Sequence, residues 1–168
     1  MEKLFTEEIR KELLDSLQGE SEKMLDVEYT RDEYNKLFPR GYIQTPIGEV
    51  KLSPHQFERM GDKDNGKRTW LLGALYQTLK NPLVIIKDID NKGRDSKLFI
   101  KLLEDNDSKN RIMVSVVPTI EGVQVVVSTG LRKEKQITSK IKSASSFYYK
   151  AEGGGPTTGT AKALPSTD

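Results

Sequence analysis

The sequence contains no cysteine and only one histidine, His55. Without cysteine the chain can form neither a disulfide nor a thiolate nucleophile, and zinc sites with Cys ligands are excluded. One histidine cannot build a His-rich metal site, so we expect neither a metal nor another cofactor. His55 should lie in the first turn of a helix, where an exposed surface residue is the simpler interpretation and a catalytic histidine the alternative.

Long apolar runs are lacking as well. The longest extends only from Leu83 to Ile86, whereas a membrane-spanning helix needs roughly 20 apolar residues. Residues 1–20 mix acidic and basic side chains and contain no apolar segment of the kind found in signal peptides. The sequence therefore predicts an intracellular protein with no membrane partner.

Charge is abundant, and its two signs are unevenly distributed. The net charge is only +2. Residues 1–38 contain 6 Lys and Arg against 11 Asp and Glu, while the remaining residues contain 21 against 14. A basic body beside an acidic segment suggests a surface that binds a polyanion, and an ordinary solvated surface is the alternative.

Helices are predicted mainly in the first half of the chain. Apolar residues recur every four positions from Phe5 to Leu17, which predicts a helix over 5–17. Thr30 and Ser53 have the side chains of N-caps and begin two further helices. The spacing of apolar residues also predicts helices over about 67–80 and 131–142.

From Leu83 the apolar period changes from that of a helix to that of a strand. Four β-rich runs follow, at 83–89, 98–104, 112–117 and 123–129, and the turns between them are short and polar. Such short connections favour an antiparallel meander. We also expect a hairpin over 42–52 and a last edge strand at 147–149. The predicted fold is α+β, with N-terminal helices packed on a four-stranded antiparallel meander sheet.

Composition divides the chain into three parts. Residues 1–37 form an acidic, helical N-terminal segment, and residues 38–150 form the main domain. Residues 151–168 consist mostly of Gly, Thr, Ser, Pro and Ala, with little to bury. This last segment is expected to be disordered.

The end of the last predicted strand has the residues of a phosphate site. Ser128, Thr129 and Gly130 combine hydroxyls with a glycine that allows close approach, and Arg132, Lys133 and Lys135 follow directly. Residues 131–150 contain 6 Lys and Arg against 1 Glu. Lys101 lies in the centre of the second predicted strand, in the sheet that carries Thr129. It is either a functional cation or simply an outward-facing residue of an alternating strand.

Four segments in this order are similar to those of one known group of proteins. They are Thr-Pro-Ile-Gly-Glu-Val at 45–50, Leu-Gly-Ala-Leu-x-x-Thr-Leu-x-Asn-Pro at 72–82, Phe-Ile-Lys at 99–101, and Ser-Thr-Gly-x-Arg at 128–132. Over about residues 38–150 the chain resembles the phage-associated branch of the barnase–EndoU–colicin–RelE-like nuclease superfamily.

The resemblance implies a site for metal-independent cleavage of RNA on the open face of the sheet. A base takes the proton of the 2′-hydroxyl, an acid protonates the leaving 5′-oxygen, and cations hold the phosphate, which leaves a 2′,3′-cyclic phosphate. By position, Lys101 and Arg132 would clamp the phosphate and Thr129 would orient it, with His55 as a further catalytic candidate. The residues implied in substrate binding are Lys67, Arg68, Ser128, Lys133 and Lys135.

The same resemblance leaves two functions open. Active members often place a histidine on the sheet, whereas this chain has Gly130 after Ser-Thr. RelE-like members use Lys, Arg and Tyr, so Lys101, Tyr148 and Tyr149 would have to serve. One function is an RNA endonuclease, or toxin, in the host cytoplasm, with an immunity or antitoxin protein as a partner. The other is an inactive binding or structural module in a phage or mobile-element particle, among phage or element proteins.

Overall fold

The structure is a computed structural model that describes residues 2–19, 21–62, 70–89, 92–105 and 108–151. Its described helices are α1 (Glu7–Ser16), α2 (Arg31–Leu37), α3 (Pro54–Asp62), α4 (Leu71–Lys80), α5 (Glu134–Ser143) and the short 3-10 helix η1 (Pro39–Gly41). Its strands are β1 (Lys3–Leu4), β2 (Glu22–Lys23), β3 (Tyr42–Thr45), β4 (Gly48–Lys51), β5 (Val84–Ile89), β6 (Asp95–Asp105), β7 (Ser108–Pro118), β8 (Gln124–Arg132) and β9 (Ser146–Lys150).

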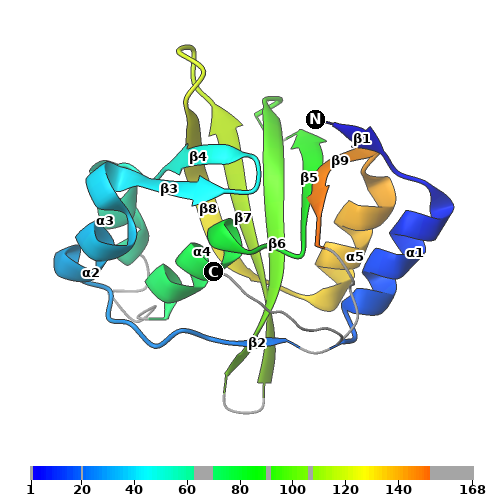
Figure 1. The fold of residues 1–168 in the computed structure, drawn as a ribbon, viewed down its shortest axis with the longest axis horizontal. Helices are drawn as coiled ribbons and strands as arrows, with labels where there is room; N and C mark the ends of the chain where they lie inside the picture. Colours follow the sequence, from blue (N-terminus) through cyan, green and yellow to red (C-terminus); the bar gives the residue numbers. More distant parts are fainter. Residues whose placement is uncertain (1, 20, 63–69, 90–91, 106–107, 152–168) are drawn as a thin grey trace.

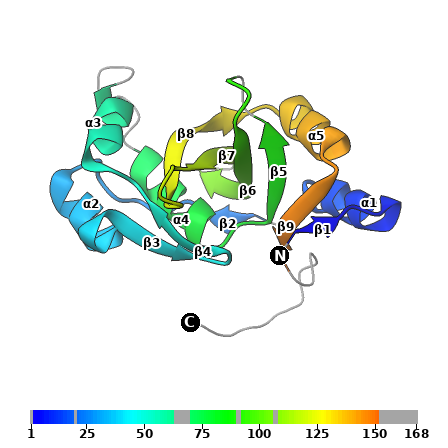
Figure 2. The same cartoon turned by 90° about the horizontal axis from the view of Figure 1, so that it is seen from above.

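The strands form a single mixed sheet of nine strands, in the order β1-β9-β5-β6-β7-β8-β4-β3, with β2 pairing in parallel with β6. The sheet curls into a half-barrel (Figures 1 and 2). Helix α4 lies inside the curl, against what we call the concave face. Helices α1 and α5 cover part of the opposite, convex face.

The predicted fold is confirmed as α+β, but the predicted extent of the sheet is wrong. Strands β5 to β8 form the expected antiparallel meander. The sheet continues beyond it, because β9 and β1 add to β5 and the β3–β4 hairpin adds to β8, with β4 parallel to β8. Two-residue strands are too short to show alternation in a sequence, and the β4–β8 pairing joins segments far apart along the chain. Strand β9, predicted as an edge strand, lies between β5 and β1.

Two predicted helix starts are confirmed by their caps. The Oγ1 of Thr30 accepts a hydrogen bond from the backbone N–H of Glu33 at 3.2 Å, and the Oγ of Ser53 accepts one from Gln56 at 3.0 Å. Such caps satisfy N–H groups that the first helical turn leaves without partners. Helix α5 begins three residues later than predicted, because β8 continues to Arg132.

Each face of the sheet has its own core. Along β6, Phe99 and Leu103 point to the concave face and pack with α4, while Leu98, Ile100 and Leu102 join the convex core with α1 and α5. This is the alternation expected of a strand buried on both faces. Because the side-chain period is two, the register assigns the paired residues of the central strands to one face or the other, apart from a register shift at Val127 of β8.

The N-terminal segment contributes to the same sheet and cores. After β2 the chain crosses α4 at Gly73, where an added Cβ would lie 2.6 Å from the backbone oxygen of Leu25. The side chain of Gln77 fixes this crossing, because its Nε2 donates to Glu22 and to the carbonyl of Lys23, both at 2.9 Å. The proposed boundary at residue 37 stays a prediction, and the tail predicted for 152–168 lies outside the described residues.

Candidate active site

Lys101 lies on the concave face, at the C-terminal end of α4. Its side chain is buried, and its Nζ lies 2.8 Å from a carboxylate oxygen of Glu22 and donates to the carbonyl of Asn81, the residue that ends α4. A cation at this position satisfies a terminal carbonyl and complements the helix dipole. The phosphate-clamping role of Lys101 stays a prediction, and these contacts favour a structural role.

Thr129 shares the concave face with Lys101, as expected. Its register partner is Val114, which pairs in turn with Phe99. Thr129 is buried, at 8% exposure. Ser128 belongs to the opposite face, because it pairs with Ser115 and through it with Leu98. The two neighbouring hydroxyls of the Ser-Thr-Gly segment therefore point to different sides of the sheet.

Arg132 lies on the convex face, so the structure does not bring it together with Lys101. Its register partner is Arg111, which pairs with Leu102 of the convex core. Beside this arginine pair, Glu134 accepts from Arg111 at 3.1 Å. Lys133 and Lys135 are exposed at the start of α5. These residues form a basic patch near the start of β7 and the end of β8, on the side away from Lys101.

His55 is the second residue of α3 and is exposed, as the simpler interpretation of the sequence predicted. Lys67 and Arg68 lie outside the described residues. The predicted site residues thus fall into a buried pair on the concave face, a basic patch on the convex face, and a separate exposed histidine.

A different lysine, Lys97, has the surroundings expected of a functional group. It lies on the concave face of β6, two residues before Phe99, and its Nζ donates to the side-chain oxygen of Gln124 at 3.2 Å. The same Nζ lies 5.0 Å from the centre of the Tyr148 ring, which β9 supplies. A cation over an aromatic face at this distance is attracted by the ring quadrupole.

A second cation stands next to Lys97. Lys87 of β5 is its direct register partner, so two ammonium groups share one cross-strand position. Like charges placed this way destabilise a sheet. Glu2 offsets part of that repulsion, since its carboxylate lies 3.5 Å from the Nζ of Lys87 and accepts from the Oγ of Ser146.

The pKa values of this cluster are displaced in a consistent pattern. Burial lowers the pKa of Lys97, although the nearby Asp95 and Glu2 oppose the shift. Burial raises the pKa of Tyr148, and the negative charge of Glu2 adds to the shift. At Glu2 the hydrogen bond from Ser146 lowers the pKa more than burial raises it. Lys97 is thus shifted toward the free amine, while Tyr148 stays protonated, as a base and an acid require.

The sequence offered only weak signals for this cluster. Tyr148 is one of the tyrosines that the sequence suggests, whereas Lys97 only precedes the predicted β-run at 98–104 and its sequence neighbours give no sign of its partners. The cluster, called the concave cluster below, joins residues 2, 87, 97, 124, 146 and 148. The pairing of β5 with β6 and β9 brings residues 87, 97, 146 and 148 together, while Gln124 comes from β8 and Glu2 precedes β1.

Within the described ranges, no group of three His, Asp or Glu side chains could hold a metal ion. None of the helices in that part of the chain is long and apolar enough to cross a membrane.

A family model matches residues 29–149, more than two thirds of the chain. Its description is phage-Barnase-EndoU-ColicinE5/D-RelE like nuclease 2. The chain belongs to this family. No curated protein and no solved structure is significantly similar to it. The match covers β3 to β8, α5 and Tyr148, and hence most of the concave cluster of this predicted nuclease.

Proposed function

We propose that this member of the nuclease family is a metal-independent RNA endonuclease, with Lys97 as the general base and Tyr148 as the general acid. The observation that carries the proposal is the contact between Lys97 and Tyr148, with Lys87 directly beside them. Perturbed pKa values in a lysine and a tyrosine that touch each other are typical of proton-transfer sites.

The chemistry uses the RNA's own 2′-hydroxyl. The free amine of Lys97 accepts the hydroxyl proton, the 2′-oxygen bonds to phosphorus, and the bond from phosphorus to the 5′-oxygen breaks. The phenol of Tyr148 protonates that leaving oxygen, and Lys87 neutralises the charge that develops on the phosphate. The products are a 2′,3′-cyclic phosphate and a 5′-hydroxyl, and proton exchange between the two side chains restores the site.

The test is incubation of the purified protein with total RNA in EDTA. We expect cleavage that persists in the chelator and fragments with 2′,3′-cyclic phosphate ends, identified by mass spectrometry. Loss of cleavage in EDTA, or fragments with 3′-hydroxyl ends, would contradict the proposal.

An inactive binding module is the second candidate. It is favoured by the separation of Lys101 and Arg132, which lie on opposite faces of the sheet, and by Gly130 at the end of the strand. A correctly folded protein that cleaves no RNA, under any condition in which its melting curve is intact, would support this second candidate. The binding partners would then be proteins of the phage or mobile element.

A further inference from the structure

The outer edge of the sheet is open at β3. This strand is the last in the sheet order, and no other described strand pairs with its outer side. The carbonyl of Gly41 accepts from the N–H of Leu52, the residue after β4, at 2.8 Å, which makes Gly41 a paired position. Because pairing alternates along an antiparallel strand, Ile43 and Thr45 also face β4, while the carbonyls of Tyr42 and Gln44 and the N–H of Gln44 point outward. The N–H of Tyr42 is already used, since it donates to the carbonyl of Pro39 at the end of η1.

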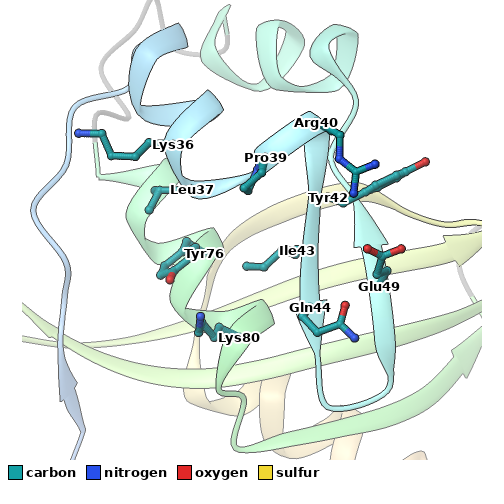
Figure 3. Close-up of a pocket in the computed structure, with 10 residues that line it drawn as sticks. All are labelled: Lys36, Leu37, Pro39, Arg40, Tyr42, Ile43, Gln44, Glu49, Tyr76 and Lys80. Carbon is teal, nitrogen blue, oxygen red and sulfur yellow. The ribbon is translucent and has the colours of Figure 1, made fainter. Parts of the chain in front are cut away.

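A pocket of about 380 Å³ lies along this edge, between β3, the end of α2 and helix α4 (Figure 3). Its apolar lining comes from Leu37, Pro39, Ile43 and Tyr76. The edge therefore offers the outward N–H of Gln44 and the outward carbonyls of Tyr42 and Gln44 beside an apolar surface. An added β-strand uses both kinds of group at once, pairing its backbone with the edge and placing alternate side chains in the pocket.

The charged lining favours an acidic occupant. Lys36, Arg40 and Lys80 line the pocket against one acid, Glu49. Lys36 pairs with Glu33 at 3.0 Å, and Lys80 lies over the Tyr76 ring at 5.5 Å. Arg40 and Lys80 have no ion-pair partner among the described residues. Two cations are thus available to an incoming carboxylate.

The backbone at Arg40 is held in an uncommon conformation. Its φ of 59° lies in the left-handed region, which side chains other than Gly, Asn and Asp seldom adopt. Gly41, with φ of 85°, follows directly, and an added Cβ there would lie 3.1 Å from the Tyr34 hydroxyl. These two residues form the turn that places Arg40 at the rim of the pocket (Figure 3). Strain of this kind concentrates at sites where geometry is fixed for a ligand.

We infer that the β3 edge is a docking site for an acidic, extended segment of a partner protein, which adds to the sheet as a further antiparallel or parallel strand. Nucleic acid shares the attraction to the cations but lacks the alternating peptide groups that pair with the N–H of Gln44 and the carbonyls of Tyr42 and Gln44. The inference does not depend on nuclease activity, since the edge and the concave cluster are separate features.

The experiment is an NMR titration of the ¹⁵N-labelled protein with a capped Glu-Val-Glu-Val-Glu peptide. We expect the largest shift, and slowed hydrogen exchange, at the outward amide of Gln44, with smaller changes at Tyr42, Ile43 and Thr45. A Lys-Val-Lys-Val-Lys peptide and hexauridylate serve as comparison ligands. The inference would be overturned by any of three results: the Lys peptide binds as well as the Glu peptide, hexauridylate shifts the Gln44 amide in place of the peptide, or the shifts depend on protein concentration alone.

Matched variants separate the backbone and charge contributions. Gln44→Pro removes the outward N–H, a change tolerated on edge strands, and should abolish peptide binding, whereas Gln44→Ala keeps the N–H and should retain it. Arg40→Gly suits the left-handed backbone, and with Lys80→Ser it should weaken binding by roughly threefold per charge. If Gln44→Pro shifts the melting curve, the test rests on the affinity of the Arg40→Gly/Lys80→Ser double variant for the Glu peptide. Unchanged affinity in that variant would refute the inference.

Discussion

Two lysines on one strand illustrate how position alone fails to define a role. Lys97 and Lys101 both belong to β6, both point to the concave face, and they flank Phe99 at about 13 Å from each other along the strand. Lys101 is neutralised by Glu22 and bonded to the end of α4. Lys97 has an amide, an aromatic ring and a second cation around it.

The difference comes from the elements packed over each lysine. Strand β2 brings the Glu22 carboxylate to Lys101, and the end of α4 brings the Asn81 carbonyl, so the charge of Lys101 is stabilised where it lies. At Lys97 the β9 strand brings a tyrosine, and burial is compensated only in part, which lowers its pKa. The comparison predicts that the two lysines affect different measurable quantities.

Replacement of Lys97 should have the largest effect, and on the rate. Lys97→Met keeps the apolar length of the side chain but removes the base, so we expect RNA cleavage per folded molecule to fall by about 10²- to 10⁴-fold. The melting temperature should not decrease. Single-turnover cleavage of a labelled RNA provides the measurement.

Lys142→Met is the matched control, because Lys142 is exposed on α5 and takes no part in the contacts of Lys97 or of Lys101. It should cleave like the unmodified chain. Equal rates for the Lys97→Met and Lys142→Met proteins would remove Lys97 from the mechanism.

Tyr148→Phe should follow, with a fall in rate of about 10²-fold, at the low end for a lost general acid. The ring that packs against Lys97 is retained, so stability should change little. A substrate with a better leaving group than a 5′-alkoxide sharpens the test, since it should restore most of the rate. A variant that is equally slow with both substrates would point to a positional defect instead of a lost acid.

Lys101→Met should act on stability instead. It leaves Glu22 and the terminal carbonyl of α4 without their cation. Removing one partner of a fully buried ion pair costs roughly 3–5 kcal/mol. Because Glu22 is 44% exposed, solvent screening reduces the expected loss to about 2 kcal/mol. Urea unfolding measures it. A lost cleavage rate without lost stability would return Lys101 to the catalytic site.

The smallest expected effect is a difference in pH dependence. The folded pKa of Lys97 lies below its usual value of 10.5, so the folded protein binds fewer protons than the unfolded chain between these two values. Between the folded and the unfolded pKa of Lys97, the free energy of unfolding therefore rises with pH. Below the folded pKa, burial of the charged ammonium lowers the stability of the protein. Lys97→Met should therefore be more stable than the unmodified chain at neutral pH, and its advantage should shrink toward pH 10. An advantage independent of pH would contradict the assignment of the shift.

Local features could be predicted from the sequence, and features that depend on pairing could not. Thr30 and Ser53 mark helix starts through contacts three residues away, and the β5–β8 meander follows from short turns. The opposite faces of Thr129 and Arg132 follow from alternation once the register is known. Tyr148 and Glu22, which distinguish the surroundings of Lys97 from those of Lys101, lie in strands more than 45 residues away along the chain. No local sequence pattern predicts such long-range contacts.

The pairing of Lys3 with Phe147 has a consequence for synthesis of the chain. The concave cluster draws on residue 2 at one end and on residues 146 and 148 at the other, so no shorter nascent chain contains it. The ribosome must release nearly all of the family domain before β9 can enter between β1 and β5. Contacts of such long sequence separation slow folding. In this order of assembly Lys97 and Tyr148 meet only at the last step, so the RNA cleavage proposed above, which needs both, would begin only when synthesis of the family domain is nearly complete.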